Sequence, residues 1–176
     1  MKSLRYILSS LVAGLLLALT LNTSVSWAGQ PVHEVILEST SSPNWSTGFW
    51  EGPAIIYIDG IKYEGDVVYT GDGNSNKNIW QGTEFKVYSF GDLGTMELSG
   101  TAKTIFAYVA PGDEHRWHRY SSHSQITGGT GAFAAAQGVF QFVGYTDWHV
   151  YPAGPPDVYA FEGTQAKIIG IQMNGQ

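Results

Sequence analysis

Residues 126–138 read ITGGTGAFAAAQG, and this stretch decides the fold. It lies between two segments of strand-like composition, residues 117–125 and 139–145. Glycine is favoured where the backbone needs a positive φ or where two backbones approach closely. A glycine-rich stretch between two strands indicates a turn. We therefore expect a strand–turn–strand unit here, with Gly129 or Gly131 at positive φ.

The same stretch lacks the pattern of a nucleotide-binding loop. A dinucleotide loop needs G-x-G-x-x-G at the start of a helix, and a P-loop needs Lys followed by Ser or Thr. Here Gly129-Thr130-Gly131 precedes a strand, and no such Lys follows. The pattern favours a structural turn over phosphate binding.

Short runs of β-forming residues, each followed by a turn signal, recur along the rest of the chain. In the first expected strand, residues 32–39, Val35 and Leu37 lie on one face, and Glu34 and Glu38 lie on the other. An Asp59-Gly60 pair between two runs is a strong hairpin signal. The expected strands are residues 32–39, 53–58, 61–70, 84–90, 93–108, 117–127, 139–147 and 158–169, with an exposed polar loop from 71 to about 81.

This count predicts an all-β protein. Eight strands can close a barrel whose interior holds side chains or one small ligand. We predict a single antiparallel eight-stranded barrel, and the pattern alone leaves a β-sandwich as the alternative.

A second segment, YSFGDLGTMELSG at residues 88–100, adds a family resemblance. Together with the glycine stretch, in the same order and at similar spacing, it resembles the allene oxide cyclase and dirigent barrels of the calycin type. The resemblance covers roughly residues 32–146 and favours the barrel over the sandwich. It also implies catalysis by confinement, in which a pocket holds a reactive molecule in one conformer and excludes water.

The resemblance implies a pocket glutamate on the first strand. Glu38 occupies that place, and we predict that it faces the lumen beside Thr40 as a catalytic and ligand-binding residue. We assign Tyr88 and Phe90 to the same ligand site. The alternative is that Glu38 is an ordinary solvent-facing residue of an alternating strand. The family's pocket cysteine has no counterpart, because the chain has no cysteine.

The N-terminus has the pattern of a secretory signal peptide. Lys2 and Arg5 precede an apolar stretch over residues 6–21, and Ser26-Trp27-Ala28 offers small residues at the two cleavage positions. We predict a signal peptide over 1–28, a barrel domain over 29–176 and a secreted or periplasmic location. An uncleaved anchor is the alternative. Without cysteine, a lipoprotein anchor, disulfides and Cys-ligated metals are excluded.

The charge balance limits the partners. The chain has a net charge of −6, and removal of residues 1–28 leaves seven basic and 15 acidic side chains. This balance argues against nucleic acid and against anionic membranes as partners. It weakly favours a neutral or cationic ligand. The resemblance adds a possible homodimer or homotrimer.

Histidine and tryptophan are the other candidate site residues. His118 lies on the opposite strand face from His115 and His123, so the cluster is a poor chelator. We predict no metal and no cofactor. The tryptophans can line a ligand mouth, or they can cover barrel ends or a subunit contact; they are Trp45, Trp50, Trp80, Trp117 and Trp148.

Two classes of function follow. The first is a binding or structural module for a small hydrophobic molecule, and the alternative is a cyclase-like isomerase acting in the lumen. The sequence has no clear acid–base constellation, which favours the first. A lumen cavity of a few hundred Å³, lined by aromatic rings and one buried carboxylate, would support a ligand site. A lumen filled by side chains would oppose it.

Overall fold

The computed structural model describes residues 29–76, 78–106, 115–149 and 157–173. The chain divides into two compact units, Met1–Gln30 and Pro31–Gln176. The predicted signal peptide, residues 1–28, lies outside the described residues. The second unit is the barrel described below.

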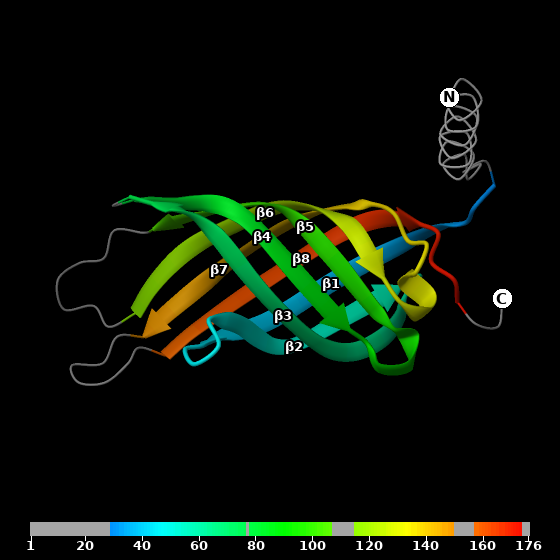
Figure 1. The fold of residues 1–176 in the computed structure, drawn as a ribbon, viewed down its shortest axis with the longest axis horizontal. Helices are drawn as coiled ribbons and strands as arrows, with labels where there is room; N and C mark the ends of the chain where they lie inside the picture. The colour runs from blue at the N-terminus through cyan, green and yellow to red at the C-terminus, as the bar shows by residue number, and fades with distance from the viewer. Residues whose placement is uncertain (1–28, 77, 107–114, 150–156, 174–176) are drawn as a thin grey trace, which may run out of the picture. The chain divides into compact units, whose positions relative to one another are not determined.

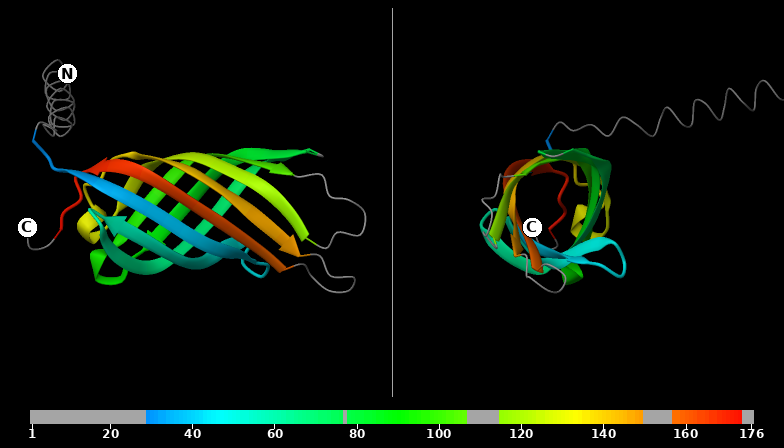
Figure 2. Two further views of the ribbon diagram at one scale, coloured as in Figure 1. Left: turned by 180° about the vertical axis from the view of Figure 1, so that it is seen from behind. Right: turned by 90° about the vertical axis from the view of Figure 1, so that its left-hand side faces the viewer.

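Eight antiparallel strands close this barrel (Figure 1). Each strand pairs with its neighbours in chain order, and β1 pairs with β8 to complete the ring, which Figure 2 shows end-on. The predicted single barrel is confirmed, and the sandwich alternative is wrong. The elements are β1 (Val32–Asn44), β2 (Phe49–Ile58), β3 (Ile61–Ser75), β4 (Ile79–Ser89), the 3₁₀ turn η1 (Gly91–Leu93), β5 (Thr95–Phe106), β6 (His115–Gly129), the 3₁₀ turn η2 (Gly131–Phe133), β7 (Val139–His149) and β8 (Asp157–Ile169).

The predicted hairpin at Asp59-Gly60 joins β2 to β3. Both residues have positive φ, 51° and 84°, which matches the twist of the flanking strands. The Asp59 carboxylate accepts a hydrogen bond from the backbone N–H of Glu34 and lies 2.6 Å from Nδ1 of His33. This hydrogen bond to His33 lowers the pKa of Asp59, and the bond from Glu34 acts in the same direction.

The glycine stretch forms the turn η2 between β6 and β7. Gly131 has φ 57°, as predicted, and a Cβ there would lie 2.5 Å from the carbonyl oxygen of Leu93. The backbone N–H and hydroxyl of Thr95 both lie within 3.0 Å of the Thr130 hydroxyl. The two segments that carry the family resemblance therefore contact each other at one end of the barrel.

Most strands are longer than the sequence pattern predicts, whereas β5 begins two residues after the start of the predicted strand 93–108. Residues 71–75 and 79–81, which belong to the predicted exposed loop, continue the hairpin of β3 and β4, with Gly71 opposite Glu84 and Ser75 opposite Trp80. Antiparallel pairing satisfies the backbone groups of this polar, glycine-rich segment, so it needs no apolar side chains to extend the sheet. The correction matters because it places Trp80 in the barrel wall.

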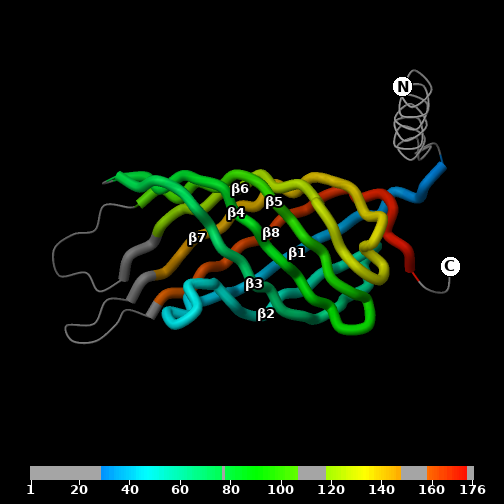
Figure 3. The backbone as a smooth tube through the Cα atoms, in the orientation of Figure 1, coloured from blue at the N-terminus to red at the C-terminus, as the bar shows by residue number. Residues whose placement is uncertain are grey.

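The barrel has two distinct ends, visible in the tube of Figure 3. The β2–β3 hairpin, η1 and η2 lie at one end, which we call the filled end. The β1–β2 and β3–β4 connections lie at the other, which we call the cavity end. Among the described residues, no helix is long and apolar enough to cross a bilayer.

Candidate functional site

Strand β4 carries charged side chains into the barrel. Its alternation buries Glu84, Lys86 and Tyr88, whereas Phe85 points outward and is 42% exposed. On β8, Glu162 lies on the buried face. Three charged side chains thus meet midway along the lumen.

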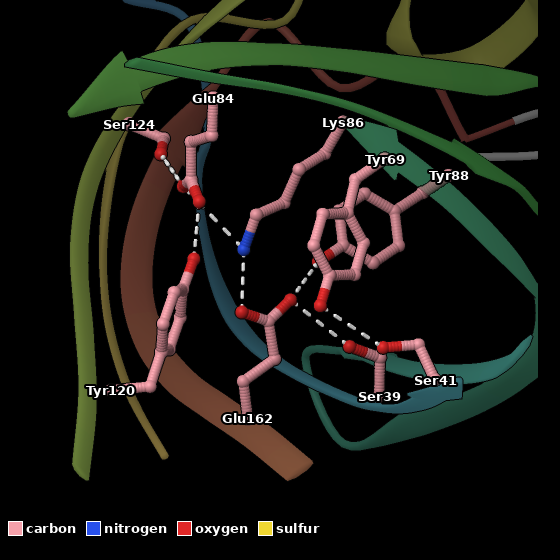
Figure 4. Close-up of polar contacts among 9 residues, drawn as sticks. All are labelled: Ser39, Ser41, Tyr69, Glu84, Lys86, Tyr88, Tyr120, Ser124 and Glu162. Atoms are coloured by element: carbon pink, nitrogen blue, oxygen red, sulfur yellow. Dashed lines mark hydrogen bonds and ion pairs between the residues drawn. The ribbon is translucent and has the colours of Figure 1, made fainter. Parts of the chain in front are cut away.

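Lys86 is the centre of this buried network (Figure 4). Its side chain is fully buried, and Nζ lies 2.5 Å from Oε2 of Glu162 and 3.5 Å from Oε1 of Glu84. Three aromatic rings also surround Nζ, with centroids at 4.2 Å for Phe142, 5.1 Å for Tyr120 and 5.3 Å for Tyr69. Ion pairing and ring contacts together offset the cost of removing the ammonium group from water.

Hydroxyl groups complete the contacts of the two carboxylates. Donors to Glu162 are Tyr88 (2.9 Å) and Ser39 (3.1 Å), and donors to Glu84 are Ser124 (2.7 Å) and Tyr120. The network contains two carboxylates and one ammonium group, so one negative charge is in excess. Because Nζ lies closer to Glu162, Glu84 has the longer ion pair and depends more on its neutral hydroxyl donors.

The tyrosines of this network are held in the phenol form. Burial is the main cause that raises the pKa of Tyr88, Tyr120 and Tyr69, and the negative charge of Glu162 raises all three further. A phenol can donate a hydrogen bond, whereas a phenolate cannot. All three groups are therefore poor acids at neutral pH. Tyr88 and Tyr120 donate to the carboxylates, and the Tyr69 hydroxyl accepts from Ser41.

Apolar side chains fill the lumen from the network to the filled end. Tyr88 stacks on Phe90 and on Phe142, with ring centroids 6.2 and 6.5 Å apart, and Phe90 contacts Phe133 at 6.0 Å. Other fully buried members of this core include Ile56, Ile58, Met96, Leu98 and Phe140. This half of the barrel is a core of ordinary protein packing.

The other half holds a cavity of about 340 Å³. Five of its ten lining residues are aromatic, and Glu84 is the one charged residue among the described lining residues. The lining residues are Trp50, Tyr69, Gly71, Ser75, Trp80, Glu84, Thr104, Phe106, Tyr120 and Thr146.

Local sequence explains why room remains at this end. Gly71 lies against the Trp80 ring, and a Cβ at that position would come within 3.2 Å of the indole. Trp50 and Tyr69 stack on each other at 5.7 Å with an interplanar angle of 15°, which fixes two walls. Glycine and stacked rings thus line a space that larger aliphatic residues would fill.

The structure corrects the predicted orientation of Glu38. Its neighbours Leu37 and Ser39 are buried, and Glu38 itself is exposed on the outer face. There it lines an outer groove with Thr40, Tyr145 and other residues of β2, β7 and β8. The prediction that Glu38 faces the lumen is wrong, because strand alternation gives that face to Val35, Leu37 and Ser39. The predicted catalytic and binding roles of Glu38 and Thr40 are not tested by this placement.

Tyr88 and Phe90 face the interior but lie away from the cavity. Tyr88 donates to Glu162, and Phe90 belongs to the filled end. Their predicted role in binding stays a prediction. Of the predicted tryptophans, Trp50 and Trp80 line the cavity, whereas Trp45 is 63% exposed.

The side chain of His115 lies outside those that the structure describes, and the two described members of the predicted histidine cluster lie in different surroundings. His118 is buried and meets Phe106 edge-on at 5.1 Å, whereas His123 is exposed. In the part of the chain that the structure describes, no group of three or more His, Asp or Glu side chains is placed to hold a metal ion.

Glu84, Lys86 and Glu162 were not singled out in the sequence. The available signal was on β8, where Glu162 shares a face with apolar residues such as Val158 and Ile168. A comparison with known proteins finds no family profile and no curated relative that matches this sequence.

Proposed function

We propose that this protein binds a small, largely apolar molecule in the cavity end of its barrel. The single observation that carries the proposal is the cavity of about 340 Å³, with aromatic residues making up half of its lining and one buried carboxylate. Ligand pockets in proteins are concave, mostly apolar and carry few polar groups. The volume corresponds to about ten water molecules, which is room for a small ligand.

The contrast between the filled end and the cavity end supports the same proposal. A barrel that served only as a rigid module would gain stability from side chains along its whole lumen. Here one half is filled and the other is lined by rings that leave space. Two of the wall rings, Trp50 and Tyr69, are held by stacking on each other, which favours a site formed before a ligand arrives.

We also propose that the protein is exported and belongs with the allene oxide cyclase and dirigent-like barrels. The charged and apolar N-terminal pattern of residues 1–28 supports export. The closed barrel and the contact between the two resembling segments support the family assignment. N-terminal sequencing of the exported protein should give Gly29 as the first residue, and an intact Met1 would contradict export with cleavage.

A second candidate function is a cyclase-like isomerase. One observation favours it: Glu84, a buried carboxylate, lies in the cavity wall beside the hydroxyl of Tyr120. The resemblance implies a pocket glutamate on the first strand, whereas Glu84 comes from β4; it is nevertheless in a position to stabilise positive charge that develops on a confined substrate.

Binding can be tested with N-phenyl-1-naphthylamine, a neutral aromatic probe that becomes fluorescent in apolar surroundings. The protein should bind it with saturable fluorescence. Thr104→Trp, which fills the cavity from β5, should abolish the signal. Thr101→Trp, on the outer face of the same strand, is the matched control and should bind as the unmodified protein does. Saturable binding that survives in Thr104→Trp, or no binding at all, would contradict the proposal.

A further inference from the structure

We infer that the cavity selects an organic cation, namely a molecule with an alkylated ammonium head and a short apolar or hydroxylated body. This inference rests on the proposed function and specifies its ligand. It is carried by three features of the cavity wall: the aromatic rings, the buried and loosely paired carboxylate of Glu84 and the unpartnered hydroxyl of Thr146.

The rings supply the first feature. They come from five consecutive strands, β2 to β6, and so surround the cavity from several sides; they are Trp50, Tyr69, Trp80, Phe106 and Tyr120. The face of an aromatic ring carries partial negative charge, and cages of such rings bind quaternary ammonium groups. The barrel already uses Tyr69 and Tyr120 in this way, since both rings contact the Lys86 ammonium group.

Glu84 supplies the second feature. Lys86 is closely paired with Glu162 at 2.5 Å, and its 3.5 Å approach to Glu84 is longer. Glu84 is only 4% exposed, and its carboxylate borders the cavity. A buried carboxylate without a full counter-charge is costly, and a cation in the cavity would reduce that cost.

Thr146 supplies the third feature. It lines the cavity, is only 8% exposed, and its hydroxyl oxygen has no hydrogen-bond partner among the residues that the structure describes. Buried hydroxyl groups nearly always have a partner. A hydroxyl or carbonyl group on the ligand body would provide it.

The chemistry of the wall selects the kind of cation. A metal ion such as Ca²⁺ needs six or more oxygen ligands. Among the residues that the structure describes, the lining offers one carboxylate, a few hydroxyls and five rings. An alkylated ammonium head sheds its water at low cost and makes close contact with rings, so it fits this wall better than a metal ion.

The test compares choline with its neutral isostere 3,3-dimethylbutan-1-ol, which has the same shape and hydroxyl group but no charge. Isothermal titration calorimetry on the unmodified protein should give choline at least tenfold tighter binding. Glu84→Gln should weaken choline about tenfold and leave the neutral alcohol unchanged. Glu64→Gln, which alters an exposed carboxylate on the outer face of β3, should change neither.

A second variant guards against misfolding of Glu84→Gln. Trp80→Leu removes one ring from the cavity wall and should weaken choline by at least threefold more than it weakens the alcohol. Equal affinity for choline and the alcohol would overturn the cation inference. If the neutral naphthylamine probe still binds in that case, the proposed function stands; if neither choline nor the probe binds, both proposals fail.

Discussion

The two ends of the barrel use the same strands for opposite purposes. At the filled end, inward residues such as Phe90, Met96 and Phe133 interlock into a core. At the cavity end, the same alternation points Trp50 and Trp80 inward, yet space of about 340 Å³ remains between the lining residues. The comparison teaches that a barrel is not filled merely because side chains point into its lumen. The size and stiffness of those side chains decide whether space remains.

The buried network lies between these ends and separates their roles. Lys86 and the two carboxylates form a polar layer across the lumen, with phenols on both sides. The filled end provides stability, and the polar layer provides charge at the base of the cavity. Four predictions test this division, from the largest effect to the smallest.

The polar layer should make the protein sensitive to alkali. Tyr69, Tyr88 and Tyr120 have pKa values raised above 10 in the folded state. Below pH 10 both folded and unfolded states keep these protons, so stability is unaffected. Above pH 10 the unfolded chain releases them and the folded chain does not, so the free energy of unfolding falls by up to about 4 kcal/mol per pH unit.

Urea unfolding at pH 8 to 11, with phenolate absorbance at 295 nm, would measure this effect. Tyr120→Phe should reduce the slope by about 1.4 kcal/mol per pH unit. Smooth titration of every tyrosine near pH 10 in the folded protein would contradict the burial of these phenols.

Removal of the central cation should be the most damaging substitution. Lys86→Met leaves two carboxylates facing each other without an ammonium group and should cost about 3–5 kcal/mol. The measurement is the free energy of unfolding in urea. Lys167→Met is the control, because its side chain is 74% exposed, and it should change stability by less than about 0.5 kcal/mol. A Lys86→Met variant as stable as its parent would contradict a charged network.

The two ends should respond differently to loss of a ring. Phe133→Ala at the filled end leaves a cavity in a close-packed core and should cost about 3–5 kcal/mol. Phe106→Ala only enlarges a space that already exists, and it should cost about 1–2 kcal/mol. Equal losses in urea unfolding would mean that the two ends are packed alike.

These contrasts also explain what the sequence could predict. Alternation and turn signals predict eight strands, the Asp59-Gly60 hairpin and the positive φ of Gly131, because each depends on local geometry. Alternation also placed Glu38 opposite Val35 and Leu37, which is where the structure has it. The family resemblance predicts the opposite orientation for Glu38, and the strand period is the better guide because side chains alternate between the two faces of a strand.

The burial of Glu84 and Lys86 cannot be predicted from strand alternation, and the reason is physical. A charged residue on an alternating strand normally marks the solvent face, since burial of a charge is costly. Lys86 reverses that rule because its partner Glu162 comes from a strand more than seventy residues away in sequence. Glu84 reverses it because its hydroxyl donors, Tyr120 and Ser124, come from β6. The cavity also depends on Trp80, and the polar composition of residues 71–81 predicts a loop there, not a strand.

The turn at the filled end should show a smaller effect than the core of that end. Gly131→Val introduces a β-branched side chain at φ 57°, next to the Leu93 carbonyl, and should cost about 1–3 kcal/mol. Thermal unfolding measures it, with exposed Ala134→Val of the same turn as the control. An unchanged melting temperature for Gly131→Val would mean that this turn does not hold η1 and η2 together.

The most direct test of the central claim is ¹⁹F NMR of protein labelled with 5-fluorotryptophan, with signals assigned by single Trp→Phe variants. The claim is that the cavity end, and not the outer surface, binds a small molecule. On titration with N-phenyl-1-naphthylamine, the Trp50 and Trp80 signals should shift together and saturate, while that of exposed Trp45 stays in place. Unmoved Trp50 and Trp80 signals at saturating probe, or a shift of Trp45 alone, would contradict the account.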